Sequence, residues 1–308
     1  MGGGKLEGRS GWRWLAGVVA GVVAASTQAA GAPRAPTPST QAAETQRALA
    51  SAGCRFELVG TGKVAKVIDG RSFVLDDGRE VRLAAVEVPL PPPSGESALQ
   101  AAPGETAARA AASEAARAAL AAMLDGATVE LRHQGMAVDR YGRILAHAYL
   151  AGDGAARSAA AELIERGHAR VAAEVGDAAC ARELLSRERV ARTAKLGLWS
   201  DPYYVPMGAE SGAELLAGRG RFTVVEGKVL SVRESGGTIY MNFGRRWSQA
   251  LTVTISKRDE GIFTGAGLAP KKLENRRVRV RGFVEERNGP RIEATRPEQI
   301  EIAEAERN

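Results

Sequence analysis

Two Asp-Gly pairs, at residues 69–70 and 77–78, separate three short segments rich in Val, Leu and Ile. An Asp-Gly pair between two strand-like runs is a strong signal for a tight hairpin turn. The sequence therefore predicts three strands that form a meander early in the chain. The predicted strands are residues 62–68, 72–75 and 80–86.

The pattern changes from strand to helix after the prolines at residues 91–93. Alanine-rich runs with interspersed charges predict helices at 105–124, 155–166 and 177–195, each followed closely by a glycine. Two further strands are predicted between the first two helices, at 128–132 and 143–150. The order of three strands, a helix, two strands and two helices predicts an α+β domain over residues 57–200: a five-stranded barrel with three helices packed on it.

The last third of the chain is predicted to be nearly all strand. Asn288-Gly289 marks a hairpin turn between two of these strands. We expect a second, small all-β barrel domain, similar to an OB-fold, over residues 221–303, after a Pro- and Gly-punctuated linker at 201–220. The predicted strands are residues 222–232, 238–243, 251–255, 277–283, 291–294 and 299–302.

Residues 1–32 have the pattern of a secretory signal peptide, with basic residues followed by a short apolar run and a small-residue cleavage site. An uncleaved N-terminal anchor is the alternative. Removing this segment's three basic residues and one acidic residue lowers the formal charge from +6 to +4. Residues 33–56 are predicted to be a flexible tether. The protein is expected to be exported, to the periplasm or outside the cell, without stable membrane insertion after cleavage.

The chain has two cysteines, Cys54 and Cys180. In an oxidising compartment an even pair favours a disulfide over two free thiols. Their spacing matches no zinc motif. We therefore predict a structural disulfide that closes a long loop.

Four segments resemble the thermonuclease (staphylococcal-nuclease-like) family, in that family's order. They begin at Val64, Val81, Asp139 and Lys195 and read VAKVIDGRS, VRLAAVEVP, DRYGRILA and KLGLWS. The resemblance covers residues 60–200. It implies an OB-type barrel and calcium-dependent cleavage of DNA and RNA phosphodiester bonds.

The resemblance also implies roles for individual residues. Arg82 and Arg143 match the family's two arginines, which neutralise the phosphate as charge builds. Tyr141 and Arg140, beside the second arginine, would contact the phosphate or nucleotide. A solvated strand residue is the alternative for Arg143.

The metal side of the resemblance departs from the family. Arg71 stands where the family has one ligand carboxylate, Glu87 matches the second, and Leu90 stands at the position of the catalytic glutamate. Asp69 and Glu87 are the carboxylates that remain as candidate metal ligands. Ca²⁺ takes six to eight oxygen ligands, so Asp69 and Glu87 alone provide too few. We expect no cofactor, or Ca²⁺ only in an altered site, and Arg71 then adds positive charge for a phosphate. The alternative for Asp69 is the polar half of an Asp-Gly turn.

The second barrel carries a cluster of aromatic and basic residues. Tyr240, Phe243 and Trp247 lie close in sequence to Arg245 and Arg246, a pattern typical of OB-folds that bind single strands by stacking bases. Arg276, Arg277, Arg279 and Arg281, interspersed with Val278 and Val280, add to this basic character. The alternative is a half-buried strand with its valines inside and its arginines facing solvent, which needs no ligand.

Three functions remain open from the sequence. The first is a protein that binds nucleic acid or another phosphate-bearing backbone with impaired or absent cleavage. The second is an active metal-dependent endonuclease, and the third is an envelope module that binds a protein partner whose identity the sequence does not give.

Overall fold

The computed structural model describes residues 54, 56–92, 105–133, 138–139, 141–150 and 157–303. The predicted signal peptide, most of the predicted tether and Arg140 lie outside these residues. Among the described residues, no helix is long and apolar enough to cross a membrane.

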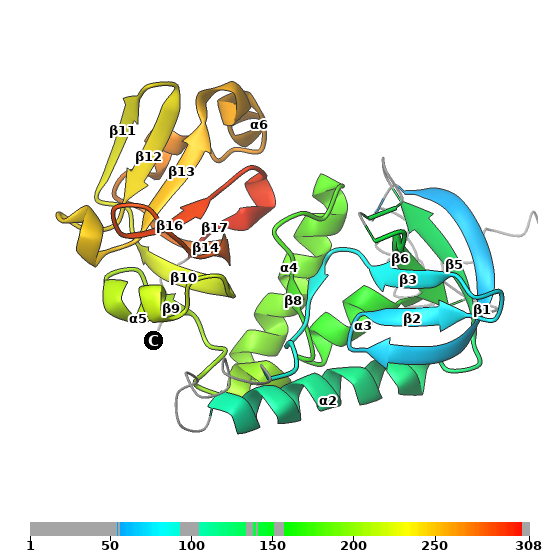
Figure 1. Cartoon of the computed structure of the whole chain (residues 1–308). Coiled ribbons are helices and arrows are strands. Elements are labelled where there is room, and N and C mark those ends of the chain that lie inside the picture. The colour runs from blue at the N-terminus through cyan, green and yellow to red at the C-terminus, as the bar shows by residue number, and fades with distance from the viewer. Residues whose placement is uncertain are drawn as a thin grey trace, which may run out of the picture. The chain divides into compact units, whose positions relative to one another are not determined.

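Five strands form a closed barrel in the first half of the chain (Figure 1). The long strand β1 pairs with both β2 and β5, β3 pairs with β2 and runs parallel to β6, and β5 pairs with β6, so the pairings close into a ring. This is the predicted OB-type barrel. The strands are β1 (Glu57–Asp69), β2 (Ser72–Leu75), β3 (Glu80–Leu83), β5 (Thr128–His133) and β6 (Ile144–Leu150).

One predicted strand is divided in two. The sequence predicted a continuous strand at 80–86, but Ala85 adopts a left-handed backbone conformation with φ 65°. This conformation is uncommon for a residue with a side chain and interrupts the strand. The chain continues as β4 (Val86–Glu87), which pairs with β8 (Arg170–Val171) instead of with the barrel.

Three helices accompany the barrel: α2 (Glu105–Leu124), α3 (Ala159–Glu165) and α4 (Ala178–Thr193). Figure 1 shows α2 lying along the barrel, against which it buries Ala116, Leu120 and Leu124. Helix α3 begins after the short strand β7 (Arg157–Ser158), and the 3₁₀ turn η2 (Gly197–Ser200) follows α4. The observed α3 and α4 lie within the predicted helices 155–166 and 177–195.

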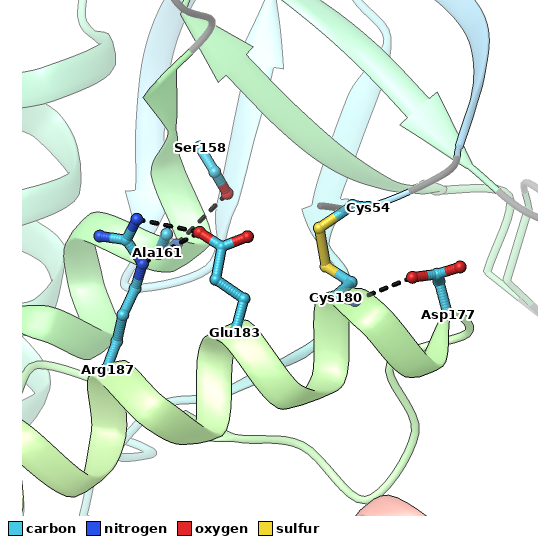
Figure 2. Close-up of a disulfide and its surroundings, with 7 residues drawn as sticks. All are labelled: Cys54, Ser158, Ala161, Asp177, Cys180, Glu183 and Arg187. Carbon is cyan, nitrogen blue, oxygen red and sulfur yellow. Dashed lines mark hydrogen bonds and ion pairs between the residues drawn. A yellow bond between two sulfur atoms is a disulfide. The ribbon is translucent and has the colours of Figure 1, made fainter. Parts of the chain in front are cut away.

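The predicted disulfide joins Cys54, just before β1, to Cys180 in the first turn of α4 (Figure 2). The Cα atoms of the two cysteines are 4.3 Å apart. Asp177 caps this turn, because its Oδ1 accepts a hydrogen bond of 2.8 Å from the backbone N–H of Cys180. The start of the barrel is thus covalently fixed to a capped helix end.

The second half of the chain repeats the strand circuit of the first barrel. β10 and β11 act as one bent strand, in which β10 pairs with β14 and β11 pairs with β12. β12 pairs with β13, and β13 runs parallel to β16. β16 pairs with β15, which follows β14 in the chain. The second half is thus all β, as predicted, in a four-stranded and a five-stranded sheet, and its pairing order is that expected of an OB-like barrel. The strands are β10 (Phe222–Lys228), β11 (Ser231–Ser235), β12 (Thr238–Asn242), β13 (Thr252–Ser256), β14 (Arg277–Phe283), β15 (Glu285–Glu286), β16 (Pro290–Glu293) and β17 (Ile300–Ile302).

The segment predicted as a linker, 201–220, contains ordered structure. β9 (Met207–Gly208) adds to β10, and α5 (Gly212–Ala217) follows it. Ala209 and Leu215 are fully buried in the core of the second barrel. The second barrel also carries α6 (Glu260–Gly265) and the 3₁₀ turns η3 (Trp247–Gln249), η4 (Lys257–Asp259), η5 (Pro270–Leu273) and η6 (Pro297–Gln299).

A buried ionic cluster connects the two barrels, and it corrects one prediction. Arg281 on β14 was expected to face solvent, but its side chain is 1% exposed. Its Nη1 and Nη2 atoms donate to the two oxygens of Glu188 on α4, at 2.9 and 3.0 Å, and Nη2 also pairs with Glu301. Nη1 donates in addition to the backbone carbonyl of Val171. Helix α4 of the first domain therefore covers this face of β14 at Arg281, whereas the side chain of Arg279 is 12% exposed and that of Arg277 is 58% exposed.

Candidate phosphate site

The turn between β1 and β2 places Arg71 at the edge of the first barrel. Asp69 Oδ1 accepts a hydrogen bond of 2.8 Å from the backbone N–H of Arg71, which fixes the turn. Gly70 lies against α2, where an added Cβ would be 2.7 Å from the Cβ of Ala116, so this position has no room for a side chain. Asp69 thus has the turn-forming role that the sequence offered as the alternative to metal binding.

Arg71 forms an ion pair with Glu87, the residue that matches the second ligand carboxylate. The Nη1 to Oε2 distance is 2.9 Å, and the two side chains are 10% and 18% exposed. A guanidinium therefore neutralises the carboxylate that a metal ion would need. The sequence showed both substitutions but not that these two side chains would meet, because the break at Ala85 turns Glu87 back toward β8.

Arg82 lies on β3, opposite Ser72 of β2 and beside Leu145 of β6. Burial lowers the pKa of its guanidinium, and the positive charges of Arg71 and Arg143 lower it further, against the opposite effect of Glu87 and Asp69. Within the described part of the chain, no carboxylate lies at ion-pair distance from Arg82. Its charge is therefore open to an external anion.

Arg143 is paired. Its Nε donates to Asp139 Oδ2 at 2.9 Å, Nη2 lies 2.7 Å from the same oxygen, and Glu80 is 3.7 Å away. The hydrogen bond to Asp139 raises the pKa of Arg143. The guanidinium carbon lies 5.2 Å from the ring centroid of Tyr141, whose side chain is 70% exposed. The expected neighbours are thus brought together at the surface.

A cavity of about 490 Å³ opens beside Arg71, Arg82 and Glu87. His133 and His147 also line it. His147 is 2% exposed and stacks on Phe56 with ring centroids 3.8 Å apart; burial lowers its pKa to about 4, so it is neutral near pH 7. Leu90 is exposed and does not line this cavity.

The described residues do not fit a calcium ion here. The site offers the carboxylates of Asp69 and Glu87, of which one holds a turn and the other is paired with Arg71. In the described parts of the chain, no group of three or more His, Cys, Asp or Glu side chains is placed to hold a metal. Calcium prefers six to eight oxygens, and a buried guanidinium opposes its charge.

A second groove, of about 590 Å³, lies on the face of the second barrel formed by β11, β12 and β13. Trp247 is 61% exposed in this groove, whereas Phe243, which the sequence grouped with it, is buried in the core at 1%. Arg245 and Arg246 are exposed but do not line the groove. Its lining residues are Arg233, Glu234, Ser235, Tyr240, Asn242, Trp247, Thr252, Arg287, Asn288 and Arg291.

The closed five-stranded barrel with its helices defines an OB-type domain, a fold that in other proteins binds oligonucleotides or oligosaccharides. Residues 80–201 match the family model described as Staphylococcal nuclease homologue, which identifies this part of the chain as similar to staphylococcal nuclease domains. A search of curated proteins by sequence gives no match.

Proposed function

We propose that the first barrel binds a phosphate-bearing backbone of nucleic acid and does not cleave it with calcium. The ion pair between Arg71 and Glu87 is the observation that carries this proposal. Where a metal ion would bind Glu87, the guanidinium of Arg71 already occupies the place and neutralises the carboxylate. Leu90 supplies no carboxylate to activate a water molecule, so the step that needs a general base has no residue to perform it.

The magnitude of the charge effect supports the loss of calcium binding. Two unit charges about 4 Å apart interact by roughly 4 kcal/mol at an effective dielectric constant near 20. The repulsion between Arg71 and a doubly charged ion is about twice as large, and calcium would also have to displace Arg71 from Glu87. A change of about 1.4 kcal/mol is a tenfold change in affinity, so the affinity for calcium should fall by many orders of magnitude.

The same charges favour a phosphate. Arg71 and Arg143 are each held in place by a carboxylate, while Arg82, whose guanidinium feels the charges of both, has no ion-pair partner among the described residues. A phosphate oxygen that accepts from Arg82 forms a charge-assisted hydrogen bond, among the stronger kinds in proteins. Tyr141, whose ring is exposed and lies beside Arg143, would then contact a sugar or base of the same backbone.

The groove of the second barrel supports the nucleic-acid proposal. It combines two accessible aromatic residues, Tyr240 and Trp247, with three arginines and one glutamate. Stacking of bases on aromatic side chains and a net positive groove are the means by which OB-folds bind single strands. The disulfide supports the further expectation that the protein is exported to an oxidising compartment, the periplasm or the exterior.

We expect the wild-type protein to bind no calcium in isothermal titration calorimetry, even with a thymidine bisphosphate present. Arg71→Asp removes the guanidinium and adds a carboxylate near Asp69 and Glu87, so this variant should show measurable heat of calcium binding. Arg189→Asp, at an exposed position on α4, makes the same change of charge away from the site and should show no heat of calcium binding. Calcium binding by the wild type, or calcium-dependent hydrolysis of DNA by it at a rate typical of the family, would contradict the proposal.

We expect fluorescence anisotropy with labelled DNA to show an affinity that falls as salt rises, because phosphate contacts release counterions. Arg82→Ala should weaken binding by roughly 10- to 100-fold, the value of a hydrogen bond to a charged group, and reduce the salt slope by about one. Arg189→Ala removes the same charge from an exposed helix position and should change the affinity less than twofold.

A binding curve that does not respond to salt, or an equal loss of affinity in both variants, would rule out the phosphate site. Trp247→Ala provides a separate comparison. If bases stack in the groove, this variant should bind single-stranded DNA more weakly than the wild type does, with a smaller loss for double-stranded DNA. This result does not depend on the outcome for Arg82.

A further inference from the structure

A second cavity, of about 250 Å³, lies between β8, the chain around residues 203–207 and β10, and it shares Glu87 and Phe283 with the lining of the phosphate-site cavity. Four of its lining residues are arginines, and the one carboxylate that lines it, Glu87, is already paired with Arg71. The arginines are Arg109, Arg170, Arg219 and Arg221. Leu90, at the position where the family has its catalytic glutamate, also lines this cavity.

Arg170 is a buried cation without a polar partner. It is 8% exposed, and its guanidinium carbon lies 5.6 Å from the ring centroid of Tyr204 and 5.1 Å from that of Phe222. Its Nε atom has no hydrogen-bond partner, and among the described residues no carboxylate reaches ion-pair distance. The Oη atom of Tyr204, a residue 4% exposed, is also without a partner.

The contrast with Arg281 shows how unusual this arrangement is. Both guanidiniums are buried, but Arg281 is surrounded by Glu188, Glu301 and a backbone carbonyl. A buried charge without such partners is costly, and folded proteins rarely retain one. Contact with two aromatic rings offsets only part of this cost.

The neighbouring arginines are held in position around the cavity. Arg109 and Arg221 both contact the same oxygen of Glu105, at 3.4 and 3.3 Å, and Arg221 also pairs with the hydroxyl of Tyr203. Arg219 is 68% exposed and pairs with Glu286. The lining therefore carries an excess of positive charge with aromatic walls. Among its four arginines, Arg170 is the one whose side chain has neither a hydrogen bond nor an ion pair within the described part of the chain, and the carboxylates of Glu188 and Glu87 act on it only from beyond ion-pair distance.

We propose that this cavity is a second anion site, which binds a phosphate monoester through Arg170 and the Tyr204 hydroxyl. A dianion fits the excess of guanidinium groups, whose fork of donors matches phosphate oxygens. The aromatic residues Tyr203 and Phe222 can contact an apolar or base moiety attached to the phosphate. The site does not depend on backbone binding at Arg82.

The test is a thermal-shift titration with inorganic phosphate, thymidine 5′-monophosphate and acetate at constant ionic strength. It is performed on the wild type, Arg82→Ala, and Arg82→Ala combined with Arg170→Met. With the Arg82 site removed, phosphate at about 100 times its Kd should raise Tm by roughly 5–10 °C. Acetate should have a smaller effect.

The variant with Arg170→Met should lose this phosphate-dependent shift and, in phosphate-free buffer, should melt at or above the temperature of its parent, because an unneutralised buried charge has been removed. A purely structural Arg170 predicts the opposite, a lower Tm at every phosphate concentration. Tyr204→Phe keeps the ring and removes only the hydroxyl, so it should fold normally and weaken the phosphate response several-fold.

A larger shift with thymidine 5′-monophosphate than with phosphate would support a nucleotide or oligonucleotide end as the source, and equal shifts would support free phosphate. The proposal fails if phosphate does not raise Tm in the Arg82→Ala background, or if Arg170→Met and Tyr204→Phe both respond as their parents do. Neither failure affects the result of the DNA-binding experiment at Arg82.

Discussion

Arg281→Ala is expected to lower the free energy of unfolding by about 3–5 kcal/mol, because it leaves Glu188 and Glu301 buried with their charges less compensated. Burial opposes ionisation of Glu188, yet the charge and hydrogen bonds of Arg281 lower the pKa of this carboxyl below its ordinary value. Removing the guanidinium reverses that balance. The measurement is urea unfolding followed by circular dichroism and by tryptophan fluorescence.

The position of the cluster gives this prediction a second readout. Arg281 lies on β14 and Glu188 on α4, so the pair fastens the second barrel to the first domain. We expect the wild type to unfold in one transition and Arg281→Ala to show two. Arg277→Ala, on the same strand, removes a pair with Glu226 whose arginine side chain is 58% exposed, and it should cost less than about 1 kcal/mol. Equal effects of the two variants would contradict the assigned role of the cluster.

Removing the disulfide is expected to have a comparable effect on the whole fold. The cysteines are separated by 126 residues, so the bond restricts the unfolded chain strongly, by about 4–5 kcal/mol on a chain-entropy model. The double variant Cys54→Ala with Cys180→Ala should therefore melt roughly 8–20 °C lower in calorimetry. Alanine is chosen because Cys180 is 1% exposed and a serine would bury a hydroxyl.

The matched control is the reductant. Adding it should lower the Tm of the wild type toward that of the double variant and leave the double variant unchanged. If thiol-reactive reagents label both cysteines in the untreated native protein, or if the double variant melts within about 2 °C of the wild type, the disulfide contributes no such stability.

Much of the fold could be predicted from local sequence patterns. The Asp-Gly turns, the alanine-rich run at 105–124 and Asn288-Gly289 predicted the elements of both barrels, because hairpin turns and amphipathic helices are encoded within a few residues. The break at Ala85 could not be predicted, since it coincides with pairing of the next residues to β8, more than 80 residues away in the chain. Pairing between segments so far apart in the sequence leaves no pattern in the residues around Ala85.

The candidate site was predicted as a set of positions but not as a geometry. The sequence identified Arg71, Glu87 and Leu90 as departures from the family, while the ion pair between the first two required the three-dimensional turn of β4. Arg281 was misplaced because an alternating strand predicts which face a residue takes, not whether a helix covers that face. Arg170 gave no sequence signal, since it is distinguished by the partners that it lacks.

The disulfide also determines how the fold takes up mechanical load. A pull through the chain that precedes residue 54 enters the fold at Cys54 and passes through a covalent bond to Cys180 on α4. It bypasses β1, which is held to β2 and β5 by non-covalent contacts alone. If the protein is attached to a surface by that end, traction loads a helix in the middle of the domain and does not unzip the barrel from its first strand.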